Sequence, residues 1–227
     1  DLTFEIPRGV LFGFIGPSGA GKTTTIRLLT GIYAATSGEL QVFGRNPSFF
    51  TRHDRTRIGY MAQLFNLYPD LTVWENLRIG AIAQGKKLNG EVDRVFALFP
   101  VLKEMTRRKG GVLSGGQQQQ LAIGRALLTN PKVLLLDEPT EGIQPNVIDQ
   151  IGETIRKLRT HGLGAEEPDP ARRIEEIGGA IKTLKKEGQI GILLVEQYLD
   201  FCLEVGDNFH IMDRGCIVAE GPIAKLN

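Results

Sequence analysis

The sequence has little of what would mark a membrane-spanning, cysteine-rich or nucleic-acid-binding protein. No apolar run approaches the roughly eighteen residues of a membrane-spanning helix, so we expect the chain not to cross a bilayer. Its two cysteines, Cys202 and Cys216, form no metal-like cluster, and a reduced cytosolic setting is the expectation. The formal net charge of +1 predicts no general attraction to nucleic acid or anionic lipid.

Positive charge is concentrated in one place, residues 45–57, where four arginines accompany His53. A solvated loop is the expectation for this stretch. The length of 227 residues predicts one α/β domain with a substantial core.

A glycine-rich string near the start of the chain fits the phosphate-binding loop pattern G-x-x-x-x-G-K-[ST]. It lies between residues 10–15, an apolar run that predicts a buried strand, and residues 23–30, which predict a helix ending at Gly31. In such a loop Lys22 would reach the β- and γ-phosphates of a nucleotide, and the Thr23 hydroxyl would hold Mg²⁺. The nucleotide-binding residues predicted here are Gly16, Pro17, Ser18, Gly19, Ala20, Gly21, Lys22, Thr23 and Thr24.

Two acids follow a second apolar run, residues 133–136. The run predicts a central parallel strand, and Asp137 at its carboxyl end is placed to bind Mg²⁺ directly or through water. Glu138 would point to the other side of the strand and activate water for attack on the γ-phosphate as a general base. Alone, the pair could cap the edge of a sheet, but the phosphate loop upstream favours the catalytic interpretation.

A third string, residues 113–117 (LSGGQ), opens a predicted helix that runs through Leu121, Arg125 and Leu128. Ser114 is a natural N-cap, and the helix start suits an anion. One domain needs only one phosphate loop to bind one ATP. A second helix N-terminus that suits an anion is explained if it contacts an ATP bound by another subunit. An ordinary capped helix is the alternative. The residues assigned to this contact are Ser114, Gly115, Gly116 and Gln117.

Together the three strings resemble the nucleotide-binding domain of ATP-binding cassette (ABC) proteins, over nearly the whole chain. The resemblance implies an α/β P-loop NTPase fold with a RecA-like parallel sheet core, a helical subdomain and a truncated N-terminal antiparallel β part. It implies an ATPase that closes head to tail on two ATP·Mg²⁺, either as a homodimer or with a paralogous subunit. It also implies transmembrane permease subunits as partners, at the cytoplasmic face of the membrane.

The resemblance assigns further roles. Gln63 would sense Mg²⁺ and the attacking water, with Thr23 and Asp137 as the other metal ligands. Four residues soon after Gln63 would either form the groove that receives a short permease helix or pack the helical arm against the core. They are Phe65, Leu67, Tyr68 and Trp74.

Two positions depart from the commonest family pattern. The expected switch segment, residues 194–197, ends in Gln197 where histidine is usual, and the expected inter-subunit loop, residues 140–145, carries Gln144 where aspartate is usual. Glutamine can hydrogen-bond but cannot become charged, so Glu138 should act as the base without a titrating partner. Both changes resemble the ATPases of urea and branched-chain amino-acid importers, and loss of activity is the alternative.

The resemblance is not uniform along the chain. Residues 58–77 look more like drug-exporter-type ATPases, whereas residues 98–149 look like the urea-importer type. Import is the favoured direction, export stays open, and a chain of mixed origin is a further hypothesis. The rival functions are a cassette ATPase acting on nucleic acid or ribosomes, and a non-hydrolysing ATP-binding module, against which Glu138 speaks.

The family pattern predicts a nucleotide-binding core at about residues 1–63 and 129–227, and a helical subdomain at about residues 64–128. Residues 148–162 are echoed by residues 174–188 with isoleucine and leucine at helical spacing, so an extra helix segment is predicted at about residues 163–188. Two ordinary amphipathic helices that look alike are the alternative.

The alternation of Leu2, Phe4 and Ile6 predicts a strand already under way at residue 1. Family members carry further residues ahead of this point, including an aromatic that stacks on adenine. The resemblance therefore leads us to expect adenine binding weakened by on the order of 1 kcal/mol.

Overall fold

The computed structural model describes residues 2–7, 9–64, 66–83, 85, 91–140, 170–188 and 190–225. Strands from these residues form a sheet in the order β2-β3-β4-β1-β5-β6. All neighbouring pairs are parallel except β5 and β6, which are antiparallel, and this confirms the predicted α/β fold. The strands are β1 Leu11–Ile15, β2 Ile58–Met61, β3 Val133–Asp137, β4 Gly191–Glu196, β5 Asn208–Asp213 and β6 Cys216–Pro222.

The register of the central strands decides where the chemistry lies. Ile15 at the end of β1 is opposite Glu196 at the end of β4. Asp137 at the end of β3 is opposite Val195 in β4. Because parallel strands end at a common edge, the residues that follow β1, β3 and β4 meet there, which is the usual ligand-binding edge of open α/β sheets.

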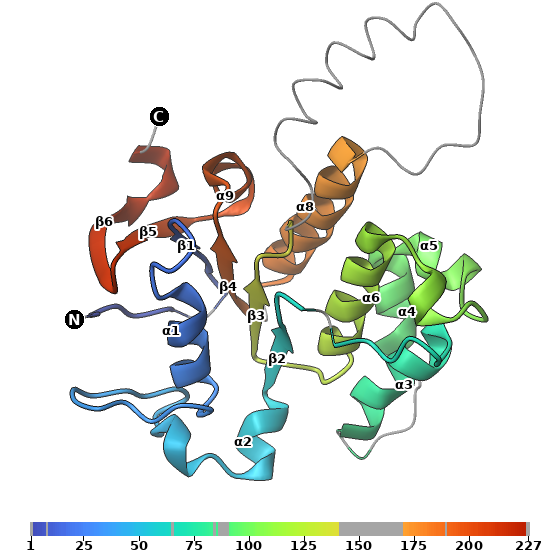
Figure 1. Cartoon of the computed structure of the whole chain (residues 1–227), viewed down its shortest axis with the longest axis horizontal. Helices are drawn as coiled ribbons and strands as arrows, with labels where there is room; N and C mark the ends of the chain where they lie inside the picture. Colours follow the sequence, from blue (N-terminus) through green and yellow to red (C-terminus); the bar gives the residue numbers. More distant parts are fainter. Residues whose placement is uncertain are drawn as a thin grey trace, which may run out of the picture.

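Helices cover both faces of the sheet. α1 lies on one side, and α6 and α8 lie on the other, with α3, α4 and α5 grouped beyond α6 (Figure 1). The α-helices are α1 Lys22–Leu29, α2 Arg52–Thr56, α3 Val73–Ala83, α4 Glu91–Leu98, α5 Pro100–Glu104, α6 Gly115–Leu127, α8 Pro170–Glu187 and α9 Leu199–Val205. The 3₁₀ turns among the described residues are η1 Pro47–Phe49, η2 Gly110–Val112 and η3 Ile223–Lys225.

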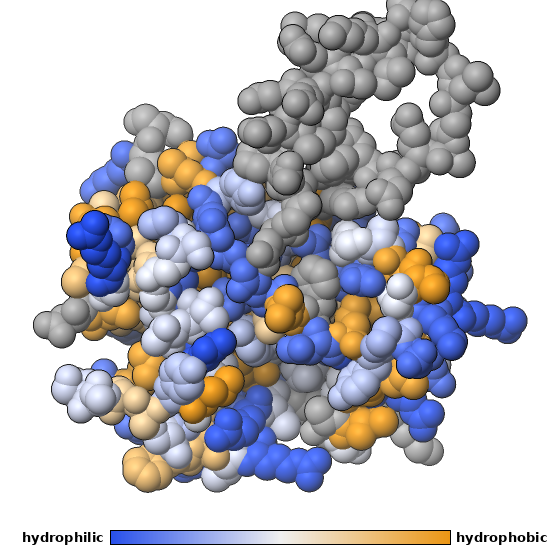
Figure 2. All heavy atoms as spheres, viewed as in Figure 1, coloured by the Kyte–Doolittle hydropathy of each residue, from blue (hydrophilic) through white to orange (hydrophobic). Residues whose placement is uncertain are grey.

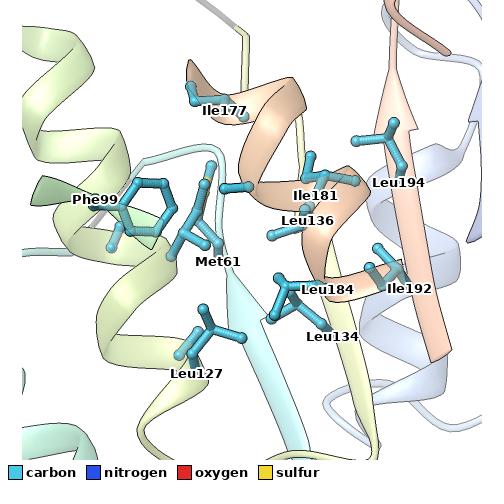
Figure 3. Close-up of a cluster of buried hydrophobic side chains, with 14 of the residues drawn as sticks. Met61, Phe99, Leu127, Leu134, Leu136, Ile177, Ile181, Leu184, Ile192 and Leu194 are labelled. Atoms are coloured by element: carbon cyan, nitrogen blue, oxygen red, sulfur yellow. The ribbon is translucent and has the colours of Figure 1, made fainter. Parts of the chain in front are cut away.

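Side chains alternate between two buried layers, as the period-two geometry of a strand requires. In β3, Leu135 packs on the α1 side of the sheet, while Leu134 and Leu136 pack on the opposite side. On that opposite side, Ile181 and Leu184 of α8 point toward the sheet (Figure 3). Each such fully buried side chain contributes about 1.5–3 kcal/mol of transfer free energy, so the sheet that carries the site is well supported.

The predicted strand at residues 1–6 is wrong, because residues 2–7 have no regular secondary structure. The alternation behind the prediction is nevertheless real, since Leu2, Phe4 and Ile6 all pack against the buried layer on the α1 side. Residue 1 lies outside the described residues. A segment can thus bury alternate side chains on a sheet without joining its hydrogen-bond ladder.

The basic stretch at residues 45–57 is also not a plain solvated loop. It contains η1 and α2, and α2 begins with a capping box in which Thr51 and Asp54 bond each other's backbone N–H groups. The Asp54 carboxylate also accepts a hydrogen bond from Arg45 at 3.0 Å. The Thr51 backbone N–H and hydroxyl donate to Asp54 and hold its carboxyl pKa below the ordinary value.

The second member of the sequence repeat is α8, and it packs in the main core rather than hanging free. The first member, residues 148–162, lies outside the described residues, as do residues 163–169 of the predicted extra segment. Gln144 and the rest of residues 141–145 in the inter-subunit loop do too. In the described part of the chain, the helices are too short or too polar to cross a membrane.

Candidate functional site

The phosphate-loop string lies where β1 ends and α1 begins, so the predicted strand, turn and helix are confirmed. Gly16 has no room for a side chain, since a Cβ there would lie 2.3 Å from the Met212 carbonyl oxygen. Gly19 and Gly21 have φ angles of +81° and +101°, which residues with side chains rarely adopt. Glycine is therefore required at three positions of this turn.

The first turn of α1 is arranged to receive an anion. Its N-cap is Gly21, and no side chain of the described residues caps the helix. The N–H groups of the first turn and the positive end of the helix dipole are left for a ligand. The other nucleotide-binding residues predicted from the sequence lie in this loop and first turn: Pro17, Ser18, Ala20, Lys22, Thr23 and Thr24.

Lys22 bends back over the loop that carries it. Its ammonium group donates to the carbonyl oxygens of Gly16 at 2.6 Å and Pro17 at 3.0 Å. The same group lies 3.5 Å from a carboxylate oxygen of Glu138. Only 4% of the lysine is exposed, so its charge is concentrated in the space between the loop and the two acids. A phosphate entering that space would meet a buried cation.

Asp137 is held from two sides at the end of β3. Its Oδ1 accepts a hydrogen bond from the Thr23 hydroxyl, and its Oδ2 accepts one from the Tyr60 hydroxyl, both at 3.4 Å. Burial, followed by the charge of Glu138, raises the pKa of the Asp137 carboxyl. Burial together with Asp137 raises the pKa of Tyr60 to about 12. Two adjacent acids in a desolvated position favour a bound cation.

Glu138 is the residue on which the site converges. Nε2 of Gln197 donates to both carboxylate oxygens, at 2.9 and 2.8 Å, and Nε2 of Gln63 donates to one of them at 3.2 Å. The Glu138 backbone N–H donates to the Val195 carbonyl oxygen at 2.8 Å. Two amides and an ammonium thus orient one carboxylate, which matches the arrangement expected of a general base or water-positioning group.

Glu138 does not simply point to the opposite side of β3, as alternation predicted. Its φ is +50°, a left-handed conformation that ends the strand and costs about 1–2 kcal/mol in a residue with a side chain. The turn brings its carboxylate to Lys22 while Asp137 bonds the neighbouring Thr23. Both acids therefore face the phosphate loop. Strain of this kind persists only where the surroundings hold it.

Glu196 and Thr140 lie in the expected switch segment and inter-subunit loop, but the sequence assigned neither of them a role of its own. Glu196 ends β4 and is 1% exposed, and its Oε1 accepts hydrogen bonds from the Thr140 hydroxyl at 2.7 Å and backbone N–H at 3.0 Å. Burial raises the pKa of the Glu196 carboxyl to about 7. The available signal was a charged residue at the end of an apolar run, where an unpartnered carboxylate would be unfavourable.

The LSGGQ string does not join this site within one chain. Ser114 caps α6 as predicted, and it forms a capping box with Gln117. Gly115 is open, since a Cβ there would meet nothing within 4 Å, whereas Gly116 is buried in the helix. α6 lies across the sheet from α1 (Figure 1). The N-terminus of α6 is thus a well-formed second helix start, separate from the phosphate loop.

The residues after Gln63 divide between packing and exposure. Leu67 packs against the main core, while Tyr68 and Trp74 are 52% and 40% exposed. Phe65 lies outside the described residues. On the face shown in Figure 2, hydrophobic residues form scattered groups among hydrophilic ones. Leu67 therefore follows the packing interpretation, and a groove for a permease helix at Tyr68 and Trp74 stays a prediction.

Comparison with known proteins places the chain among transport ATPases. The family described as "ABC transporter" matches residues 1–141. The branched-chain amino acid transport ATP-binding protein BraG of Pseudomonas aeruginosa is 34% identical over 231 residues, which cover 100% of this chain and 87% of that protein. Nod factor export ATP-binding protein I of Burkholderia pseudomallei is 40% identical over 167 residues, 71% of this chain and 54% of that protein.

A solved structure extends the likeness to three dimensions. It is the dimeric ATP-binding cassette MJ0796 in a post-hydrolysis state, bound to ADP and phosphate. It has a TM-score of 0.74 and 25% identity, and the match covers 97% of this chain and 88% of that one. The P-loop NTPase fold predicted from the sequence is therefore confirmed.

Proposed function

Because this chain belongs to the ABC transporter family, whose members are ATP-hydrolysing subunits of transporters, we propose that it powers membrane transport through ATP-driven closure of a dimer. The observation that carries the proposal is the convergence of Lys22, Gln63 and Gln197 on the buried Glu138 carboxylate. A carboxylate so oriented beside a phosphate loop fits water activation better than structural support alone.

ATP binding rests on the phosphate loop. The loop amides and Lys22 would cradle the β- and γ-phosphates, where Lys22 would exchange its present carbonyl partners for phosphate oxygens. The Thr23 hydroxyl and the Asp137 carboxylate supply the hard oxygen ligands that suit Mg²⁺, and they already contact each other. Gln63 is the third proposed metal ligand, and its amide group now bonds Glu138.

Hydrolysis is assigned to Glu138. With the γ-phosphate in the loop, its carboxylate would accept a proton from the attacking water as the in-line displacement proceeds. Gln197 keeps the carboxylate oriented and would reach the γ-phosphate by hydrogen bonding, without changing its own charge. Mg²⁺, when bound, would supply charge neutralisation on the phosphates.

The second helix start, at α6, supports a dimer. Ser114, Gly115, Gly116 and Gln117 would contact the ATP held by the phosphate loop of a second subunit, either a copy of this chain or a paralogue. The helical arm that carries this contact would comprise about residues 64–128. The nucleotide-binding core would comprise about residues 1–63 and 129–227. Exposed Tyr68 and Trp74 would face permease subunits, with the chain held at the cytoplasmic side of the membrane.

Import of the branched-chain amino-acid type is the direction we favour, because the similarity to BraG spans the whole chain. Export is the second candidate, since a higher identity to a Nod factor export protein covers 71% of the chain. Vesicles that carry this chain with its own permease would decide. Movement of a labelled branched-chain amino acid toward the ATPase side supports import, and movement of cargo away from it supports export.

Phosphate release by the chain tests the catalytic assignment. We expect turnover in the presence of Mg²⁺, none with a chelator, and a loss of about 10²- to 10⁴-fold for Glu138→Gln with ATP binding retained. Glu204→Gln is the matched control, because this acid is half exposed on α9 and pairs only with Lys182 among the described residues. Full turnover by the Glu138→Gln variant would contradict the assignment.

A further inference from the structure

The carboxylate and backbone carbonyl of Glu196 together join three segments at the edge of the sheet where β1, β3 and β4 end. Its Oε1 accepts two hydrogen bonds from Thr140, and its Oε2 accepts one from the backbone N–H of Gln197 at 3.2 Å. Its backbone carbonyl accepts the Gly16 N–H at 3.3 Å. One residue therefore touches the phosphate loop, the switch glutamine and the chain leaving β3.

These contacts form a closed ring that includes Glu138, the proposed general base. Glu138 is linked along the chain, through Pro139, to Thr140, and the Thr140 hydroxyl donates to the Glu196 carboxylate. Glu196 is followed by Gln197, whose Nε2 donates back to the Glu138 carboxylate at 2.8 Å. The two arms of the ring leave the ends of β3 and β4, which are neighbours in the sheet. Loss of the Thr140–Glu196 contact would leave the chain after Glu138 held by fewer bonds.

The ring of contacts stabilises an unfavourable backbone conformation at Glu138. Its φ of +50° is unfavourable for a residue with a side chain, and such a conformation persists only where neighbouring contacts fix it. The backbone N–H bond to Val195 fixes one side of the residue. Thr140, two residues on and 1% exposed, is the described anchor on the other side.

We propose that Glu196 is a positioning residue for ATP hydrolysis, whose carboxylate anchors Thr140 so that the Glu138 carboxylate stays aligned with Gln197. The inference rests on the proposed role of Glu138. Glu196 touches neither phosphate nor water in this scheme, because both of its oxygens are engaged by Thr140 and Gln197. Its effect is on the rate of hydrolysis and not on the binding of ATP.

The test compares variants that differ by one hydrogen-bonding group. Thr140→Val removes the hydroxyl donor while keeping the side-chain shape, and Thr140→Ser keeps the hydroxyl. Glu196→Met removes both acceptors, whereas Glu196→Gln keeps the Oε1 acceptor. Thr183→Val is the control, because its hydroxyl makes a comparable bond on the exposed side of α8, to Gly179.

Turnover and ATP affinity are measured separately on the full chain, with folding checked by circular dichroism. We expect kcat to fall by about tenfold or more in Thr140→Val and Glu196→Met, with the Kd for ATP within about twofold of the unchanged protein. Thr140→Ser and Glu196→Gln should restore most of kcat, and the control should match the unchanged protein. A merely structural role would lower thermal stability without this split between kcat and Kd.

The double variant Glu196→Met with Thr140→Val completes the test. If the two residues act through one contact, it should lose little more kcat than either single variant. Unchanged kcat in both single variants, or a loss of kcat explained by weaker ATP binding, overturns the inference alone. An unchanged protein without turnover, or an active Glu138→Gln variant, contradicts the proposed function and the inference with it.

Discussion

The two helix starts that are suited to phosphate, at α1 and at α6, differ in how much of a site surrounds them. The start of α1 is surrounded by Lys22, two acids and two glutamine amides from three other strand ends. The start of α6 has its own capping box, made by Ser114 and Gln117, and Gln118 donates to the carbonyl oxygens of Gly110 and Leu113. The first is a site nearly complete in one chain, and the second is, under the proposed function, one half of a contact between two chains.

The difference has a physical consequence. Around α1, other groups already hold Lys22, Asp137 and Glu138, so a substitution there changes chemistry inside one chain. At the start of α6, Gly115 is exposed and a Cβ there would meet nothing within 4 Å, whereas Gly116 is buried. A substitution at Gly115 should therefore act on the proposed dimer while leaving the folded chain intact.

Among the substitutions that test this comparison, the largest effect is expected at the site around α1. Lys22→Met removes the buried ammonium that lies beside Glu138 and would bind the phosphates, so turnover should fall by about 10²- to 10³-fold and ATP affinity should fall as well. Phosphate release and nucleotide binding measure the two effects. Lys186→Met, at the exposed end of α8, is the control and should leave both unchanged. Retained ATP binding in Lys22→Met would contradict the assignment of the phosphate loop.

A second prediction concerns the start of α6, where Gly115→Ala should separate an effect on the dimer from an effect on folding. Gly115→Ala should keep or raise the free energy of unfolding, by up to about 1 kcal/mol, because alanine is the better helix former. The same methyl group would obstruct a partner's ATP, so turnover should fall by about 10²-fold. Urea unfolding and phosphate release measure these two quantities.

Gly179→Ala provides the comparison for that variant. Gly179 lies in α8, and a Cβ there also meets nothing within 4 Å. It should gain stability to a similar degree and keep full turnover. If Gly115→Ala is as active as Gly179→Ala, the start of α6 has no role in hydrolysis and the inter-subunit assignment is wrong.

The smallest expected effect is a pH dependence of stability. Burial raises the pKa of Glu196 to about 7 against an ordinary value of 4.5, and the charge of Glu138 acts in the same direction, while the donors of Thr140 and Gln197 oppose it. A raised folded-state pKa contributes stability that is fully present below pH 4.5 and is lost as the pH rises through 7. The nearby Cys202 thiol is buried, and its pKa is raised, so it stays neutral in this range.

Urea unfolding of the unchanged protein and of Glu196→Gln at pH 5.5 and pH 8 measures this contribution. The unchanged protein should lose more stability than the variant between the two pH values, since the amide does not titrate. An equal change in both proteins would mean that the Glu196 carboxyl titrates at its ordinary pKa.

Local patterns in the sequence predicted the parts of the site that are local in the fold. The phosphate loop lies between a strand and a helix, and Ser114 caps α6, because glycine geometry and capping depend on a few consecutive residues. The acids at the end of β3 were found for the same reason. Parallel pairing then brings Gln197 to Glu138 without any further sequence signal.

The parts that the sequence did not predict depend on distant contacts. Glu196 meets Thr140 across 56 positions of the chain, and no periodicity encodes that meeting. Residues 2–7 alternate like a strand, yet they bury their apolar side chains without strand pairing. The left-handed turn at Glu138 overrode the alternation that predicted its direction. In each case tertiary packing decided between local options.

In the proposed dimer, the ATP of a second subunit completes the half site at the start of α6. The most direct test is the solution mass of the Glu138→Gln variant with and without ATP·Mg²⁺, by light scattering after size exclusion. The account predicts a doubling of mass that depends on ATP and that Gly115→Ala abolishes when combined with it. A mass that stays that of one chain with ATP bound would contradict the account.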